Sequence, residues 1–209
     1  LVVRRSAWNA DRPGTLTGIE SKLRYPLFVK PVNLGSSIGI SKVHDRQSLE
    51  SAIELAAGYD VKMMVETSVE NARELECAVL GNDVPKASVI GEIIPGAEFY
   101  DYTTKYIDDR SQLIVPAELP ESISAEIQRM SVEAFRAIDC AGLGRVDFLL
   151  APSGDIFLNE INTMPGFTPI SMYPRLWQAS GIPYAELIDE LIQLALARHR
   201  ETRKVSVTR

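Results

Sequence analysis

The sequence predicts an α+β protein, and three patterns lead to that prediction. Short apolar and β-branched runs separated by turn-forming residues follow one another between residues 70 and 118, which is typical of consecutive strands. Two further runs, 145–151 and 156–162, flank the turn-forming cluster Pro152-Ser153-Gly154-Asp155 and indicate a hairpin. Apolar residues recur with helical spacing in 122–138 and in 183–197.

The N-terminal part of the chain is expected to mix strands with helices. Asp45 has the side chain of a helix N-cap, and Leu49, Ile53 and Ala56 would line one face of the following helix, which Gly58 would end. In chain order, the predicted elements are a strand at 1–3, a loop and a short helix within 20–24, strands at 27–31 and 38–43, a helix at 46–57 and a strand at 61–66.

The rest of the chain is expected to hold a larger α+β unit, with a boundary near Ser68 that divides the chain into 1–68 and 69–209. Its predicted elements are strands at 74–80, 84–86, 88–94, 99–102 and 113–115, a helix at 122–138, the hairpin, and helices at 172–179 and 183–197. The apolar stripes of these helices are interpreted as core, and they comprise Ile123, Ile127, Met130, Ala134, Phe135 and Ile138, followed by Tyr184, Leu187, Ile188, Leu191 and Leu194.

Composition narrows the class of protein. With 209 residues, 45% of them hydrophobic and 24% charged, the sequence is typical of a globular protein, and it has no apolar stretch of membrane-spanning length. The net charge of −6 argues against a general nucleic-acid surface. Cys77 and Cys140 are isolated in the sequence, which argues against a disulfide scaffold or a zinc site and fits a reducing cytoplasm. The basic tail from residue 198 is expected to be frayed.

The hairpin carries the first candidate site. A turn centred on Ser153-Gly154 would place Ala151 opposite Ile156 and, further along, two polar pairs on one face: Asp147 opposite Glu160, and Arg145 opposite Asn162. Facing carboxylates repel unless a positive group lies between them, and a set of oxygen ligands favours a hard cation such as Mg²⁺. The alternative is a solvated sheet face on which Arg145 makes an ordinary ion pair.

A glycine- and serine-rich loop is the second candidate site. Lys30 lies near the end of the strand at 27–31, and Gly35, Ser36, Ser37 and Gly39 follow before the next predicted strand. Backbone N–H groups and hydroxyls in such a loop suit a phosphate chain, with Lys30 supplying charge. The loop matches neither the Walker pattern nor GxGxxG, so an ordinary connecting loop is the alternative.

Four motifs in family order give the chain a resemblance to a known family. VKPVNLGSSIGISKV, FYDYTTKY, GRVDF and NEINTMPGFTPISMYP together resemble the ATP-grasp fold, and more closely the D-alanine–D-alanine ligases, over residues 26 to 177. The resemblance implies two α+β subdomains that grip ATP between them. Residues 1–68 would be part of the central subdomain with the phosphate loop, and 69–209 would be the C-terminal subdomain with the metal and substrate site.

The resemblance also implies ligands for ATP and for two Mg²⁺ or Mn²⁺ ions. Asp147, Glu160 and Asn162 would bind the metal ions. Glu74 would hold the ribose hydroxyls, with Glu76 as the alternative. The other nucleotide contacts would be Lys30 to the phosphates, Gly35, Ser36 and Ser37 closing over them, Glu66 to the adenine amino group, the Val69 backbone to the ring edge, and Lys105 to the γ-phosphate.

The implied reaction joins two D-alanine molecules for peptidoglycan precursor synthesis. A carboxylate attacks the γ-phosphate to give an acyl phosphate, and the amine of the second D-alanine displaces phosphate. Arg145 and Gly166 would stabilise the oxyanion, and Ser36 and Tyr106 would lie near the second amine. Ser171 and the Met172 backbone would bind the second carboxylate. A cytoplasmic homodimer is expected.

Two departures and two alternatives accompany the resemblance. The family has an N-terminal domain with an acidic residue for the first D-alanine, and an early lysine that contacts ATP. Neither is visible here, so the chain is expected to be a fragment or a truncated form whose own turnover is in question. The alternatives are a ligase with another acceptor, such as D-lactate, for which Tyr106 and the preceding loop are the residues to examine, and a nucleotide-binding module without catalysis.

Overall fold

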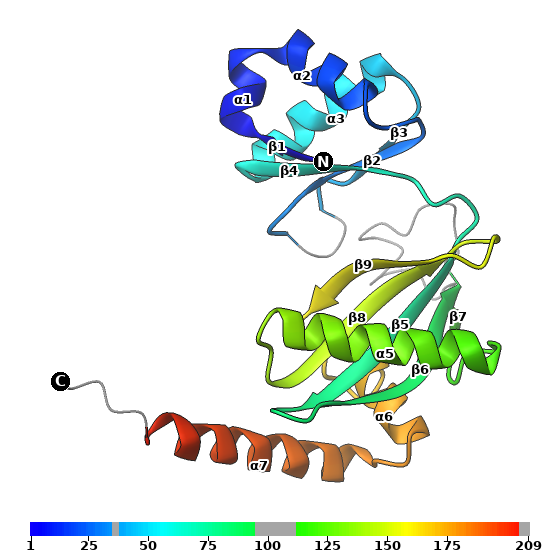
Figure 1. The fold of residues 1–209 in the computed structure, drawn as a ribbon, viewed down its shortest axis with the longest axis vertical. Coiled ribbons are helices and arrows are strands. Elements are labelled where there is room, and N and C mark those ends of the chain that lie inside the picture. The colour runs from blue at the N-terminus through cyan, green and yellow to red at the C-terminus, as the bar shows by residue number, and fades with distance from the viewer. Residues whose placement is uncertain (35–37, 95–111, 205–209) are drawn as a thin grey trace. The chain divides into compact units, whose positions relative to one another are not determined.

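The computed structural model describes residues 1–34, 38–94 and 112–204. These residues form two compact units, one comprising 1–70 and the other comprising 71–94 together with the residues from 112 onward. We call them the N-terminal unit and the C-terminal unit, and Figure 1 labels their helices and strands. The predicted strand at 99–102 lies outside the described residues.

The N-terminal unit is an antiparallel sheet covered on one face by helices (Figure 1). Its strands, in the spatial order β1-β4-β2-β3, are β1 (Val2–Arg4), β4 (Lys62–Thr67), β2 (Leu27–Pro31) and β3 (Ser41–Val43). Its helices are α1 (Arg5–Ala10), α2 (Arg12–Glu20) and α3 (Arg46–Tyr59). Val29 and Val65 point into the helix-covered core, so the side chains of Lys30 and Glu66, one position further along each strand, point to the other face.

The N-terminal connection differs from the prediction. Residues 5–20, expected to be mostly loop, form α1 and α2, whereas the short helix expected within 20–24 is absent because residues 21–24 form a turn and an irregular segment. The Asp11 side chain caps α2 by accepting from the Gly14 N–H at 2.9 Å, and Pro13 lies in the first turn, where a missing N–H costs no helical hydrogen bond. Residues 11–14, which suggested a loop in the sequence, thus form the start of a helix.

The predicted helix after Asp45 is confirmed with small shifts at its end. Asp45 accepts from the Ser48 N–H at 2.7 Å, and the Ser48 hydroxyl lies 3.2 Å from the Asp45 N–H, which completes a capping box. Leu49 and Ile53 are fully buried, as expected. Gly58 does not end the helix, which continues to Tyr59.

The C-terminal unit is a five-stranded antiparallel sheet in the spatial order β7-β6-β5-β8-β9 (Figure 1). Its strands are β5 (Arg73–Gly81), β6 (Lys86–Ile94), β7 (Gln112–Ile114), β8 (Gly142–Leu150) and β9 (Ile156–Asn162). Helix α5 (Glu121–Ala137) lies on one face over a core that includes Leu75, Ile127 and Phe135. Helices α6 (Met172–Ala179) and α7 (Tyr184–Thr202) follow the hairpin.

The helix predicted at 172–179 is confirmed, and four details of this unit were predicted wrongly. Val84 is exposed within the turn between β5 and β6 and belongs to no strand. Ile138 lies beyond the end of α5 and is half exposed. Helix α7 runs to Thr202 into the tail expected to fray, and of its predicted inner face only Leu187 is buried.

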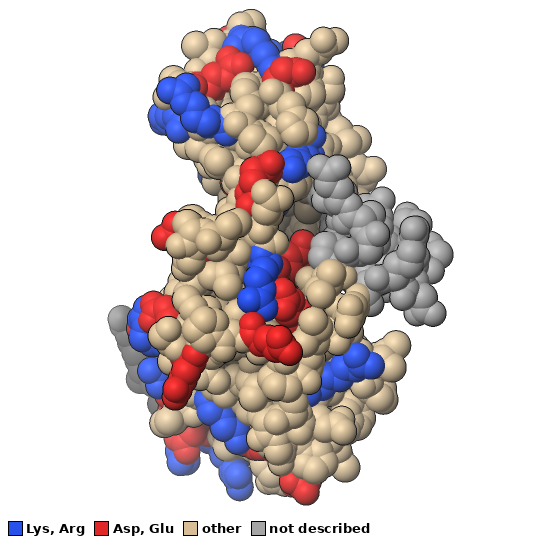
Figure 2. Space-filling view, turned by 90° about the vertical axis from the view of Figure 1, so that its right-hand side faces the viewer, with Lys and Arg blue, Asp and Glu red and all other residues tan. Residues whose placement is uncertain are grey.

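Two further observations concern the helices and the charged side chains of the described residues. Within the described ranges, no helix combines the length and the hydrophobicity that a membrane crossing requires. On the face drawn in Figure 2, Lys and Arg side chains are interspersed with Asp and Glu side chains.

Candidate active site

The hairpin of β8 and β9 places four polar residues on one face of the C-terminal sheet. Asp147 is the cross-strand partner of Glu160, and Arg145 is the partner of Asn162, as predicted from the sequence. Val146 is buried on the opposite face within the core under α5. Strand alternation therefore separates the site from the core.

The register near the turn differs from the prediction by one residue. Ile156 pairs with Leu150 and not with Ala151. Further along, a β-bulge next to Asp147 adds one residue, Asn159, to β9. The two offsets cancel, so the predicted partners at the site are correct although those near the turn are wrong.

Arg145 is held against Asp147 by two parallel hydrogen bonds. Arg145 Nε donates to Asp147 Oδ1 at 2.7 Å, and Nη2 donates to Oδ2 at 2.7 Å. The Arg145 side chain is only 13% exposed. This burial by itself would lower the pKa of the guanidinium, but the bonds to Asp147 and the charges of the neighbouring carboxylates raise that pKa above its usual value. Arg145 is therefore a fixed positive charge in the site.

Asn162 connects the two facing acids. Its Nδ2 donates to Asp147 Oδ2 at 3.0 Å and to Glu160 Oε1 at 3.1 Å. One small amide group thus lies within reach of both carboxylates. A hard divalent cation in that place would meet oxygens of both acids, and rotation of the amide would add Asn162 Oδ1. This set of donors fits Mg²⁺ or Mn²⁺.

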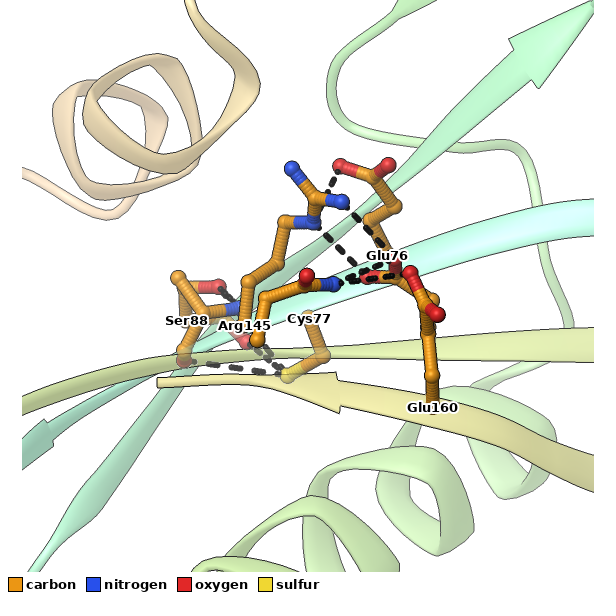
Figure 3. Close-up of polar contacts among 8 residues, drawn as sticks. Glu76, Cys77, Ser88, Arg145 and Glu160 are labelled. Atoms are coloured by element: carbon orange, nitrogen blue, oxygen red, sulfur yellow. Dashed lines mark hydrogen bonds and ion pairs between the residues drawn. The ribbon is translucent and has the colours of Figure 1, made fainter. Parts of the chain in front are cut away.

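Glu76 adds a third carboxylate to the same face. Strand β8 lies between β5 and β9, and Glu76 of β5 is the cross-strand partner of Asp147. Glu76, Asp147 and Glu160 therefore lie in one row across three strands. Glu76 is 5% exposed, and its Oε2 lies 3.0 Å from Arg145 Nε (Figure 3). Within the described part of the chain, no three His, Cys, Asp or Glu side chains are grouped around a point that could hold a metal ion. From the sequence, Glu76 was predicted only as an alternative ribose ligand, because spacing alone does not show that β5 pairs with β8.

The N-terminal unit pairs two of the predicted nucleotide ligands. Lys30 Nζ lies 2.6 Å from Glu66 Oε1 on the sheet face that the helices leave uncovered. The Lys30 side chain is mostly buried, whereas that of Glu66 is about one-third exposed, at 36%. Lys30 therefore presents a positive charge whose position is fixed by β2 and β4.

Asp60 holds the start of the glycine- and serine-rich loop, a role that the sequence analysis missed. Its Oδ2 accepts from the backbone N–H of Val32 at 3.0 Å and of Asn33 at 2.8 Å, and the Asn33 side chain donates to the same oxygen. The Asn33 N–H is the main cause that lowers the pKa of Asp60 below its ordinary value of 3.8. An Asp directly after a helix and before a strand was the available signal.

The remaining predicted residues fall into two groups. Gly35, Ser36, Ser37, Lys105 and Tyr106 lie outside the described residues. The others are described: Val69 and Glu74 are partly exposed, Ser171 and Met172 lie at the start of α6, and Gly166 lies in the loop that precedes it.

A small loop structure precedes α6. The Ser171 hydroxyl accepts from the Thr168 N–H at 3.1 Å and lies 2.9 Å from the Thr168 hydroxyl. A Cβ placed on Gly166 would lie only 3.1 Å from Ser171 Oγ, so the glycine backbone approaches this hydroxyl closely. Gly166, predicted to stabilise the oxyanion, thus lies beside Ser171, which together with the adjacent Met172 is predicted to bind the second carboxylate.

Comparisons with known proteins agree on one family. The family model described as the D-ala D-ala ligase C-terminus matches residues 1–193. A D-alanine–D-alanine ligase from Bacillus cytotoxicus is 53% identical over 204 residues, covering 98% of this chain and 56% of the relative. A ligase of the same name from Natranaerobius thermophilus is 54% identical over 199 residues, covering 95% of this chain and 54% of the relative.

Solved structures give the same result. The D-alanine-D-alanine ligase from Coxiella burnetii superimposes with a TM-score of 0.83 at 39% identity, covering 97% of this chain and 53% of that chain. The VanG D-Ala:D-Ser ligase from Enterococcus faecalis superimposes with a TM-score of 0.82 at 40% identity, covering 93% of this chain and 55% of that chain. The chain spans about half the length of the curated relatives it matches.

Proposed function

Because this chain belongs to the D-alanine–D-alanine ligase family and has the ATP-grasp fold of its structural neighbours, we propose that it forms the nucleotide, metal and acceptor sites of an ATP-dependent D-alanine–D-alanine ligase. The product would be D-alanyl-D-alanine for peptidoglycan precursors. The observation that carries the proposal is the facing pair Asp147 and Glu160, with Asn162 between them and Arg145 beside them.

Asp147, Glu160 and Asn162 are the proposed ligands of two Mg²⁺ or Mn²⁺ ions. When bound, these ions neutralise the charge on the transferring phosphate and orient it. The protein side of this arrangement is the register of β8 and β9, which holds the two carboxylates on one face, and the Asn162 amide, which already lies within hydrogen-bonding distance of both.

Three of the proposed ATP ligands are described residues of a single unit. In the N-terminal unit, Lys30 would contact the phosphates, Glu66 would accept from the adenine amino group, and the Val69 backbone would meet the ring edge. The Lys30–Glu66 ion pair on the sheet face opposite the helices supports this assignment. Gly35, Ser36, Ser37 and Lys105 complete the proposed phosphate contacts.

Glu74 is the proposed ribose ligand in preference to Glu76. Both side chains lie on the same face of β5, since they are two residues apart. Glu74 is partly exposed, whereas Glu76 is buried against Arg145 and therefore points away from solvent. A ribose hydroxyl reaches an exposed carboxylate more readily.

The proposed chemistry needs little covalent participation by the protein. A carboxylate oxygen of the first D-alanine bonds to the γ-phosphorus while the bond to ADP breaks, and the amine of the second D-alanine then displaces phosphate from the acyl carbon and loses a proton. Arg145 and the Gly166 N–H would stabilise the oxyanion of the tetrahedral intermediate. Ser171 and the Met172 backbone would hold the second carboxylate, with Ser36 and Tyr106 near the second amine.

The acceptor defines the second candidate function. One of the structural neighbours, VanG, is named as a D-Ala:D-Ser ligase, and this chain is 40% identical to it, so a related ligase with another acceptor is the alternative. Tyr106 and the preceding loop are the proposed determinants of that choice. The whole enzyme is proposed to be a cytoplasmic homodimer that binds no nucleic acid.

An ADP-release assay on the full-length protein with Mg²⁺ tests the proposal. We expect ADP release and dipeptide formation with D-alanine alone, and neither with L-alanine. D-Serine or D-lactate, each supplied together with D-alanine, tests the acceptor: a mixed product formed in preference to D-alanyl-D-alanine would establish the alternative. ATP binding without ADP release under any of these conditions would indicate a nucleotide-binding module without catalysis.

A further inference from the structure

Glu76 has no role in the proposed reaction, yet it is the most buried carboxylate of the site face. It lies on β5 directly beside Asp147 and forms an ion pair with Arg145, with Glu76 Oε2 3.0 Å from Arg145 Nε. We propose that Glu76 is a positioning residue, which shares the positive charge of Arg145 and thereby leaves the charge of Asp147 available to a divalent cation. This inference rests on the proposed function, because it concerns the same metal site.

The geometry assigns Glu76 to the arginine and not to the cation. Arg145 lies between two acids, since its Nε approaches both Glu76 Oε2 at 3.0 Å and Asp147 Oδ1 at 2.7 Å. Figure 3 shows the Arg145 guanidinium turned toward the Glu76 carboxylate, whereas Glu160 extends from a different strand, β9. The Asn162 amide connects Asp147 with Glu160, which are the two acids proposed to bind the metal.

The charges give the reason for a third acid. Three carboxylates and one guanidinium leave the row with two net negative charges, which equals the charge of one of the two proposed divalent cations. Without Glu76, Arg145 would be balanced by Asp147 alone, and the cation would meet the uncompensated charge of Glu160 only. Opposite charges this close in a poorly hydrated site interact strongly, so sharing the guanidinium between two acids should strengthen cation binding. Residues that hold metal ligands in place typically change metal affinity by about 10- to 100-fold when replaced.

The test compares Mn²⁺ binding by the full-length protein and its Glu76→Gln variant in the absence of nucleotide. The electron paramagnetic resonance signal of free Mn²⁺ gives the dissociation constant. We expect Glu76→Gln to weaken Mn²⁺ binding by about tenfold. In turnover, kcat should fall while the KM for ATP stays within about twofold, because Glu76 is not a nucleotide ligand. If Glu76 were a ribose ligand, the variant would instead raise the KM for ATP and leave kcat nearly unchanged.

Glu92→Gln is the matched control. Glu92 is also a buried sheet carboxylate, 8% exposed, and it accepts two hydrogen bonds from Arg73 at 2.7 and 2.6 Å. Its cross-strand partner is Leu75, whose neighbour in sequence is Glu76, so Glu92 lies on the opposite face of the sheet. The variant removes the same charge and an equivalent ion pair, and we expect unchanged Mn²⁺ affinity.

Three outcomes overturn the inference: unchanged Mn²⁺ affinity in Glu76→Gln, an equal loss in Glu92→Gln, or a rise in the KM for ATP at constant kcat. Asp147→Asn separates this inference from the proposed function. If Asp147→Asn binds Mn²⁺ normally, the metal site itself is refuted, whereas a loss in Asp147→Asn without one in Glu76→Gln refutes only the role of Glu76. If Glu76→Gln does not fold, Glu76→Asp replaces it in the test. Its shortened side chain should weaken Mn²⁺ binding severalfold, and normal Mn²⁺ binding by Glu76→Asp would contradict the inference.

Discussion

Asp147 and Glu160 face each other across adjacent antiparallel strands, and the amide nitrogen of Asn162 donates to both carboxylates. Two acids at this spacing repel unless a positive group compensates them. Arg145 lies against both Asp147 and Glu76, so in our proposal both facing acids keep negative charge that can draw a cation into the site.

Replacement of Glu160 by Gln should therefore abolish Mg²⁺-dependent turnover. We expect ADP release in the presence of D-alanine to fall by about a hundredfold or more, because a neutral amide replaces one of two charged ligands. Glu133→Gln, on the exposed surface of α5, is the control for loss of one negative charge. Normal turnover in Glu160→Gln would refute the metal assignment.

Arg145→Ala should impair ligation more than ATP binding. Removal of a group that stabilises an oxyanion typically costs about 10²- to 10³-fold in kcat, whereas none of the proposed ATP contacts involves Arg145. Kinetics of ligation and equilibrium ATP binding should be measured on the same preparation. Arg73→Ala removes a guanidinium from the opposite face and serves as the control. Equal losses of ligation and ATP binding would show that Arg145 is purely structural.

Asp60→Asn should weaken ATP binding by loosening the start of the glycine- and serine-rich loop. The wild-type carboxylate accepts from the backbone of Val32 and Asn33, and a neutral amide oxygen is a weaker acceptor. Titration of ATP against both proteins measures the effect. Asp83→Asn, in the exposed turn between β5 and β6, should bind ATP as the wild type does.

The same aspartate predicts a pH dependence of stability. Because folding lowers the pKa of Asp60 below 3.8, its contribution is fully present above that pH and is lost as the pH falls through the folded pKa. The stability difference between wild type and Asp60→Asn, measured by urea unfolding, should therefore shrink below pH 3.8. A difference that stayed constant between neutral pH and about pH 2 would contradict this origin.

Two conservative core substitutions should act on different units. Ile53 lies in the core of the N-terminal unit and Ile127 in that of the C-terminal unit, and both are fully buried. Replacement of either by Val should lower the free energy of unfolding of its own unit by about 1 kcal/mol. The two tryptophans allow each unit to be observed alone, since Trp8 belongs to the first core and Trp177 to α6.

Fluorescence-detected urea unfolding of single-tryptophan variants measures this. With Trp177→Phe, the signal of Trp8 should shift in Ile53→Val and not in Ile127→Val. With Trp8→Phe, the signal of Trp177 should show the reverse. Equal shifts of both signals in both variants would show that the units unfold as one.

Much of the fold could be predicted because its elements carry strong local signals. The strand at Leu27–Pro31 and the helix capped by Asp45 were recognised because apolar spacing and a capping side chain agree there. The site pairs Asp147–Glu160 and Arg145–Asn162 were also predicted correctly. That success depended on two one-residue errors that cancel, since neither the longer turn nor the bulge at Asn159 has a clear sequence signal.

One of the errors concerns a local helix start, and the other two concern long-range contacts. Pro13 and Gly14 suggested a loop, but they lie in the first turn of a helix that Asp11 caps. The apolar side of that helix is buried in the core. Glu76 could not be placed next to Arg145 without knowing that β5 pairs with β8. Asp60 contacts residues 27 and 28 positions earlier in the chain, and its place between a helix and a strand does not by itself indicate which residues it contacts.

Strand β9, which carries Glu160 and Asn162, is the outermost strand of its sheet in the described structure, whereas β8, which carries Asp147 and Arg145, has a neighbour on each side. Glu160 therefore lies on a strand that pairs with the rest of the sheet along one edge only. Deuterium uptake by the amides of β9 should slow when a cation links the two carboxylates, while uptake by β8 should be slow throughout.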